Sequence, residues 1–173
     1  GSNIRVGSRR YFVNNGGQYD SKFWERVDFM NGMTVLTFVR YYLPGYKSGG
    51  PIRSIVGMVE SLSDQVNFLI VTSDRDAEDL HPYASVRVDE WNVVGKARVF
   101  YASPRRQSLV SFSRLIRQTP HDILYLNSFF DPKFTLLPLL ARALGLIPKS
   151  PTVIAPRGEL SEGALSLKAW KKQ

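Results

Sequence analysis

The sequence contains no cysteine and only two histidines, His81 and His121. Because cysteine is absent, the chain can form no disulfide, no thiolate metal site and no cysteine nucleophile. Two histidines are too few for a typical zinc site, and no Ser-His-Asp arrangement can be built on either, since both lie in or beside expected loops. We therefore expect no bound metal, and a structural or solvated role for both histidines.

Long apolar runs are also missing. No uncharged apolar run reaches the roughly 18 residues that a membrane-spanning helix requires. The N-terminus lacks the basic start and apolar core of a signal peptide. Together with the absence of cysteine, these features favour a cytoplasmic protein.

The composition that remains is that of a globular domain. The chain has 173 residues, of which 43% are hydrophobic and 22% are charged. A chain of this length forms one domain and buries about 70% of its unfolded surface. Disorder throughout and a collagen-like repeat are both excluded by this composition.

The net charge of +8 is unevenly distributed. Residues 54–95 hold eight acidic and two basic side chains, whereas residues 96–117 hold six basic side chains and no acidic one. Such a block predicts a basic face that meets phosphates, anionic lipid or nucleic acid. An ordinary solvated helix face is the alternative. The basic residues that flank one expected helix are Arg105, Arg106, Arg114 and Arg117.

Residues 1–32 contain Asn-Gly dipeptides, which are typical of turns. This pattern predicts an extension or linker with one short helix at 23–30. From Met33 onward, short β-branched apolar runs alternate with helical patterns. The expected strands are 34–39, 66–71, 86–88, 98–101, 122–126 and 152–155. The expected helices are 51–62, a segment with Leu109, Phe112, Leu115 and Ile116 on one face, an apolar and therefore buried helix at 134–146, and 162–172.

This alternation predicts an α/β domain with a doubly wound, mostly parallel, Rossmann-like sheet and helices on both faces. Ligands of such sheets bind beyond the carboxyl ends of the strands. By this prediction the loops at 40–50, 127–131 and 156–160 lie at that edge.

The first of these loops contains Gly49 and Gly50 just before a helix. Glycines allow the backbone to approach a ligand closely, and the start of a helix favours an anion. The loop is neither a P-loop nor a dinucleotide fingerprint, because the required order of residues is absent. An ordinary strand-to-helix turn is the alternative.

The other two loops carry polar side chains. Asn127 and Ser128 could bond a sugar hydroxyl, or they could cap the next turn. Arg157 has the planar fork that suits phosphate or carboxylate, and Glu159 could orient it or bind a hydroxyl. An internal ion pair between Arg157 and Glu159, with no ligand, is the alternative.

Three segments are similar to the N-terminal half of family 4 glycosyltransferases, which are retaining enzymes of the GT-B architecture. They are Gly49-Gly50-Pro51, residues 122–130 (DILYLNSFF) and, most specifically, residues 155–168 (APRGELSEGALSLK). The similarity covers about residues 33–172. In this family two Rossmann-like domains face each other across a cleft, and the N-terminal one mainly takes the acceptor.

The resemblance implies that residues 33–173 form the acceptor-side domain, with the donor-binding domain absent from this sequence. It implies a nucleotide-sugar donor, a glycan or lipid-linked acceptor of the kind used in polysaccharide or lipopolysaccharide synthesis, and no further cofactor. Gly49 and Gly50 match the glycine loop of the family, and Arg157 and Glu159 match its Arg-Gly-Glu stretch. Tyr125 and Asn127 stand where many relatives have a histidine, and no catalytic residue is assigned.

Acceptors of such enzymes are often held at the inner face of the cell membrane. The resemblance therefore implies a peripheral membrane position, with Arg105, Arg106, Arg114 and Arg117 toward anionic lipid, and no nucleic-acid partner. The alternative function is a non-catalytic α/β binding domain that uses its basic face for nucleic acid or an anionic membrane.

Overall fold

The computed structural model describes residues 2–6, 9–13 and 32–156, and the chain divides into two units, residues 1–30 and 31–173. In the first unit β1 (Ser2–Val6) and β2 (Arg9–Val13) form an antiparallel two-stranded sheet in which Ser2 is paired with Val13. No strand was predicted there, because the turn dipeptides of this segment suggest a linker. The helix expected at 23–30 lies outside the described residues.

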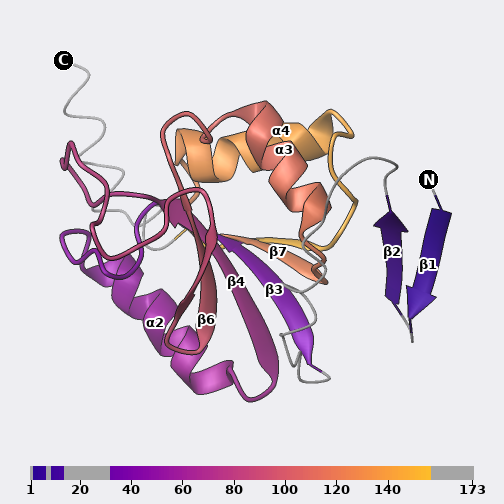
Figure 1. Ribbon diagram of the computed structural model, residues 1–173, viewed down its shortest axis with the longest axis horizontal. Helices are drawn as coiled ribbons and strands as arrows, with labels where there is room; N and C mark the ends of the chain where they lie inside the picture. The colour runs from indigo at the N-terminus through magenta and orange to yellow at the C-terminus, as the bar shows by residue number, and fades with distance from the viewer. Residues whose placement is uncertain (1, 7–8, 14–31, 157–173) are drawn as a thin grey trace. The chain divides into compact units, whose positions relative to one another are not determined.

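The second unit contains a six-stranded sheet in the order β5-β6-β4-β3-β7-β8 (Figure 1). Neighbouring strands are parallel except for β5, which is antiparallel to β6 at one edge. The parallel strands are β3 (Met33–Phe38), β4 (Val66–Ser73), β6 (Ala97–Ala102), β7 (Ile123–Leu126) and β8 (Thr152–Ile154).

The parallel strands follow the order 3-2-1-4-5 when numbered along the chain, which is the Rossmann order. The direction of winding reverses between β3 and β7. As a result α2 (Gly50–Leu62) covers one face, while α3 (Leu109–Gln118) and α4 (Leu137–Ala143) cover the other (Figure 1). The predicted fold class, a mostly parallel α/β sheet with helices on both faces, is thus confirmed.

The packing of β3 explains why its sequence does not alternate between apolar and charged residues. Val35 packs in the same cluster as Ile55 of α2, whereas Leu36 and Phe38 pack on the opposite face with Phe112 of α3. The Phe38 and Phe112 rings meet edge to face, with centroids 5.1 Å apart. A strand that is covered on both faces cannot show the alternation of a half-exposed strand.

The strand predicted at 86–88 is wrong, because these residues form turns and the edge strand is β5 (Trp91–Val94). A tight turn at Gly95-Lys96 joins β5 to β6, and Gly95 has a φ of 56°. The sequence did contain this signal, since a two-residue loop with glycine between two β-branched or aromatic runs indicates a hairpin.

The apolar helix predicted at 134–146 is shorter at its end and less buried than expected. Asp131 caps a π-helix, η1 (Pro132–Leu136), that leads into α4, and the helix ends before Gly145, whose φ is 70°. Three leucines spaced four residues apart lie about half exposed along its outer side: Leu136, Leu140 and Leu144. The helix expected at 162–172 lies outside the described residues.

Candidate functional site

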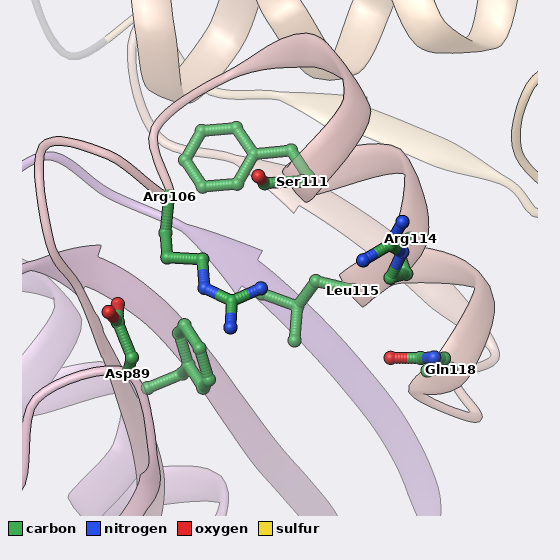
Figure 2. Close-up of a pocket in the computed structure, with 8 residues that line it drawn as sticks. Asp89, Arg106, Ser111, Arg114, Leu115 and Gln118 are labelled. Carbon is green, nitrogen blue, oxygen red and sulfur yellow. The ribbon is translucent and has the colours of Figure 1, made fainter. Parts of the chain in front are cut away.

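A cavity of about 170 Å³ lies between α3 and Phe100 of β6, and Arg106 and Arg114 line it (Figure 2). It shares no residue with the loops that follow β3 and β7. The fold predicts a ligand at the carboxyl edge of the sheet, where the loops after β3 and β7 lie.

The loops after β3 and β7 are joined at the point where winding reverses. The backbone N–H of Asn127 donates to the Phe38 carbonyl at 3.0 Å. The guanidinium of Arg40 lies 3.6 Å from the buried carboxylate of Asp131, and about half of the Arg40 side chain is exposed. In Rossmann-like sheets this reversal point is where ligands bind.

Asp131 also organises the chain after β7. One of its carboxylate oxygens accepts hydrogen bonds from the N–H groups of Lys133 and Phe134, at 2.9 and 2.6 Å. The Ser128 hydroxyl accepts a hydrogen bond from the Asp131 N–H at 3.2 Å. Ser128 thus caps this turn, and Asn127 is buried at the end of β7, whereas the predicted bond from either side chain to a sugar hydroxyl stays a prediction.

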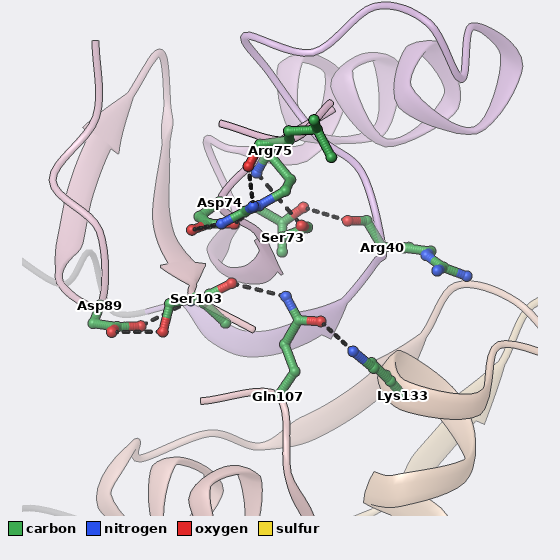
Figure 3. Close-up of polar contacts among 11 residues, drawn as sticks. Arg40, Ser73, Asp74, Arg75, Asp89, Ser103, Gln107 and Lys133 are labelled. Carbon is green, nitrogen blue, oxygen red and sulfur yellow. Dashed lines mark hydrogen bonds and ion pairs between the residues drawn. The ribbon is translucent and has the colours of Figure 1, made fainter. Parts of the chain in front are cut away.

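The charges along this edge are unequally neutralised (Figure 3). The Arg75 guanidinium forms a bidentate ion pair with the buried Asp74, in which Nε and Nη2 donate to the two carboxylate oxygens at 2.8 and 3.0 Å. The ammonium group of Lys133 donates at 3.1 Å to the amide of Gln107, whose own NH₂ donates to the Ala102 carbonyl. Because an amide is neutral, this contact leaves the Lys133 ammonium without a counter-charge from Gln107.

The β3–α2 loop is held by a side chain from the β4–β5 loop. The carboxylate of Asp76 accepts hydrogen bonds from the N–H groups of Tyr46, Lys47 and Ala77, at 2.8, 3.1 and 2.8 Å. Burial acts to raise the pKa of Asp76, but these three hydrogen bonds outweigh it, and the pKa lies below its usual range. Asp76 is only 3% exposed.

Gly45 is the glycine of this loop that the fold requires. A Cβ at this position would overlap the Tyr83 hydroxyl and would lie 2.9 Å from the Tyr42 carbonyl oxygen. By contrast, a Cβ on Gly49 or Gly50 would meet no atom within 4 Å, although Gly49 has a φ of 37°. The predicted approach of a ligand to Gly49 and Gly50 therefore stays a prediction.

Sequence reasoning missed both Gly45 and Asp76. The available signal was the acidic run at 74–79, which directly follows a buried strand and so had to lie at the same edge as Lys47. Arg157 and Glu159, also predicted for this edge, lie outside the described residues.

The four arginines predicted to face a membrane are all exposed. Arg114 and Arg117 lie on α3, whereas Arg105 and Arg106 precede its N-cap, Ser108, in a turn. Within the described ranges none of the four is within ion-pair distance of an acidic side chain.

Two features are absent from the part of the chain that the structure describes. No group of three or more His, Asp and Glu side chains there could hold a metal ion. No helix there has the length and apolar character needed to cross a membrane.

A scan against protein-family models and searches of curated proteins and of solved structures found no match to this chain.

Proposed function

We propose that residues 33–173 are the acceptor-side domain of a retaining glycosyltransferase with the GT-B architecture. The donor is a nucleotide sugar, the acceptor is a glycan or a lipid-linked glycan, and the donor-binding domain lies in sequence outside this chain. The observation that carries the proposal is the Rossmann strand order, with Arg40 and Lys133 at its reversal point. Two of the segments similar to family 4 enzymes, 49–51 and 122–130, lie in or beside the loops at this edge.

These side chains suit an anionic, hydroxyl-rich ligand. Arg40 and Lys133 attract phosphate oxygens, and the fork of Arg40 is oriented by Asp131. Most of the groups that stabilise the departing nucleoside diphosphate would belong to the donor-binding domain, and Arg40 and Lys133 would add positive charge from the opposite side of the cleft. Gln107 offers an amide that can exchange its bond to Lys133 for one to a sugar hydroxyl.

The test uses the protein in its full genomic length and the 173-residue chain in parallel. The full-length protein is assayed for transfer from a panel of nucleotide sugars to glycan and lipid-linked acceptors, and Arg40→Gln and Lys133→Gln should each lower kcat/KM at least about tenfold. Arg87→Gln is the matched control, because Arg87 is exposed and pairs with Glu90.

The 173-residue chain should give no turnover with any donor. Sugar transfer by this chain alone would overturn the division of roles between two domains. Absence of transfer by the full-length protein with every donor, or an equal loss in the Arg87 control, would refute the proposal itself.

A second candidate function, a non-catalytic domain that binds anionic polymers or surfaces, is favoured by the four exposed arginines around α3. Such a domain should bind single-stranded or duplex nucleic acid, or anionic vesicles, with an affinity that falls steeply as salt rises. Strong salt-dependent binding of nucleic acid, without sugar transfer, would favour this function over the first.

A further inference from the structure

The cavity beside α3 combines an apolar floor with a cationic rim. Phe100, Phe112 and Leu115 supply apolar surface, and Arg106, Arg114 and Gln118 supply polar groups. Figure 2 shows the guanidinium of Arg106 extending into the cavity toward Leu115, with Arg114 and Gln118 reaching it from α3.

The fold fixes the positions from which both arginines reach the cavity. The N–H of Arg106 donates to the Ser103 carbonyl at 2.9 Å in the turn that follows β6. Arg114 lies on α3, one turn before Gln118. The position of Phe112 in the floor is also fixed, because its ring packs against the rings of Phe38 and Phe134.

Neither arginine is neutralised within the described ranges, where no acidic side chain lies at ion-pair distance from them. Asp89 lines the same cavity, but its two carboxylate oxygens accept from the N–H and the hydroxyl of Ser103, at 2.9 and 2.8 Å (Figure 3). The cavity therefore has two cations against one carboxylate that is already hydrogen-bonded.

We infer that this cavity binds a phosphate ester that carries a small apolar group. The planar fork of a guanidinium matches two phosphate oxygens at once. Phe100 and Leu115 are partly exposed in the cavity, and an apolar group attached to the phosphate would cover them and remove their apolar area from water. An ion without an apolar group would leave this floor uncovered.

The same chemistry occurs in a soluble organic phosphate and in an anionic phospholipid headgroup. The lining of this cavity includes neither Arg40, Lys133 nor Gln107, so binding here does not depend on the function proposed above.

The test measures phenyl phosphate and inorganic phosphate binding to the 173-residue chain by NMR titration. Two double variants remove the same charge: Arg106→Gln with Arg114→Gln, inside the cavity, and Arg105→Gln with Arg117→Gln, outside it. Thermal unfolding of both variants verifies that each is folded. A charged hydrogen-bond partner contributes about tenfold or more to affinity.

Phenyl phosphate should bind more tightly than inorganic phosphate, and the cavity variant should lose at least about tenfold in affinity while the outer variant changes less than about twofold. Equal losses in the two variants, equal affinity for the two phosphates, or no saturable binding would each overturn the inference. Vesicles with and without phosphatidic acid distinguish the sources. Vesicle binding with the same dependence on Arg106 and Arg114 identifies a lipid headgroup, and its absence with phenyl phosphate binding retained identifies a soluble phosphate.

Discussion

The guanidinium of Arg40 lies 3.6 Å from the carboxylate of Asp131, which links the loops after β3 and β7 across the reversal point of the sheet. The backbone of Arg40 has a separate role. Its carbonyl accepts hydrogen bonds from the Ser73 N–H and the Thr72 hydroxyl, at 3.0 and 3.1 Å. The side chain of Arg40 can therefore be changed without loss of the contacts that hold β3 to β4.

We therefore predict that substitutions of Arg40 and of Asp131 lower the free energy of unfolding by different amounts. Asp131→Ala removes the cap of η1 and should lower the free energy of unfolding by about 1–2 kcal/mol. Asp131→Asn keeps a capping oxygen and should cost less than about 1 kcal/mol. Arg40→Gln removes a half-exposed ion pair and a contact between the guanidinium and the Tyr41 ring, 5.6 Å from its centroid, and should cost about 1 kcal/mol or less. Urea unfolding measures all three. An Arg40→Gln variant as unstable as Asp131→Ala would contradict the assignment.

Gly45 and Gly50 should respond in opposite directions to alanine. Gly45→Ala forces a Cβ against the Tyr83 hydroxyl and the Tyr42 carbonyl, and should destabilise the chain by about 1–3 kcal/mol. Gly50→Ala meets open space at the start of α2 and should stabilise it by up to about 1 kcal/mol.

A double variant isolates the cause of the Gly45 effect. The Tyr83 hydroxyl is buried and has no hydrogen-bond partner among the described residues, so Tyr83→Phe by itself should change stability little. In combination with Gly45→Ala it should restore part of the loss. Purely additive effects in the unfolding measurements would exclude the contact with Tyr83 as the cause.

The lowered pKa of Asp76 predicts a pH-dependent contribution to stability. The unfolded chain binds the proton more tightly than the folded chain, so the ionised carboxylate stabilises the fold above the unfolded Asp pKa of about 3.9. The contribution is lost as pH falls through the lower folded pKa. Asp76→Asn should be less stable than the parent near pH 7, and the difference should narrow toward pH 3. A difference that does not change with pH would refute this account.

The His121 ring is expected to be neutral in the folded chain near pH 7. Burial lowers its pKa against the opposing effects of the Thr119 carbonyl and Asp122. The ring Nδ1 lies 2.7 Å from the Thr119 carbonyl and Nε2 lies 3.0 Å from the Ser150 hydroxyl. Because a carbonyl only accepts, we assign the proton to Nδ1, so that Nε2 accepts from Ser150.

The sign of the His121 effect is opposite to that of a paired histidine. Above the unfolded His pKa of about 6.5 the ring is neutral in both states. As pH falls below that value the unfolded chain binds the proton first, so stability decreases until the folded pKa is reached. Unfolding of the parent and of His121→Gln between pH 5 and 8 measures this slope, and His81→Gln serves as the control. An unchanged slope in His121→Gln would disprove the assignment.

The fold of residues 32–156 was largely predictable because its parallel strands are short apolar runs between helical patterns. The exception was β5, an edge strand with partly exposed side chains, in which Trp91 and Val93 are not part of a continuous apolar run. In the segment predicted as a helix at 134–146, Asp131 marks where the helical turns begin and Gly145 marks where they end. The prediction followed the apolar residues of the segment and did not use these two signals.

The sequence predicts at which edge of the sheet the candidate site lies, but not which side chains contact one another there. The strand order places the loops at one edge, yet no local pattern pairs Arg40 with Asp131, which are far apart in sequence. Asp76 and Gly45 could not be linked from the sequence either, since their contact depends on two loops that meet only in the folded chain.

The Asp76 carboxylate has a consequence for how this loop could gain or lose a ligand. Successive backbone N–H groups that converge on one point form a receptor for any anion of suitable size. Here the Asp76 carboxylate of the same chain occupies that anion-binding site, so the loop needs no bound anion to fold. A single change of Asp76 to a small neutral residue would vacate it, and a buffer or metabolite anion could then take the place of the missing carboxylate.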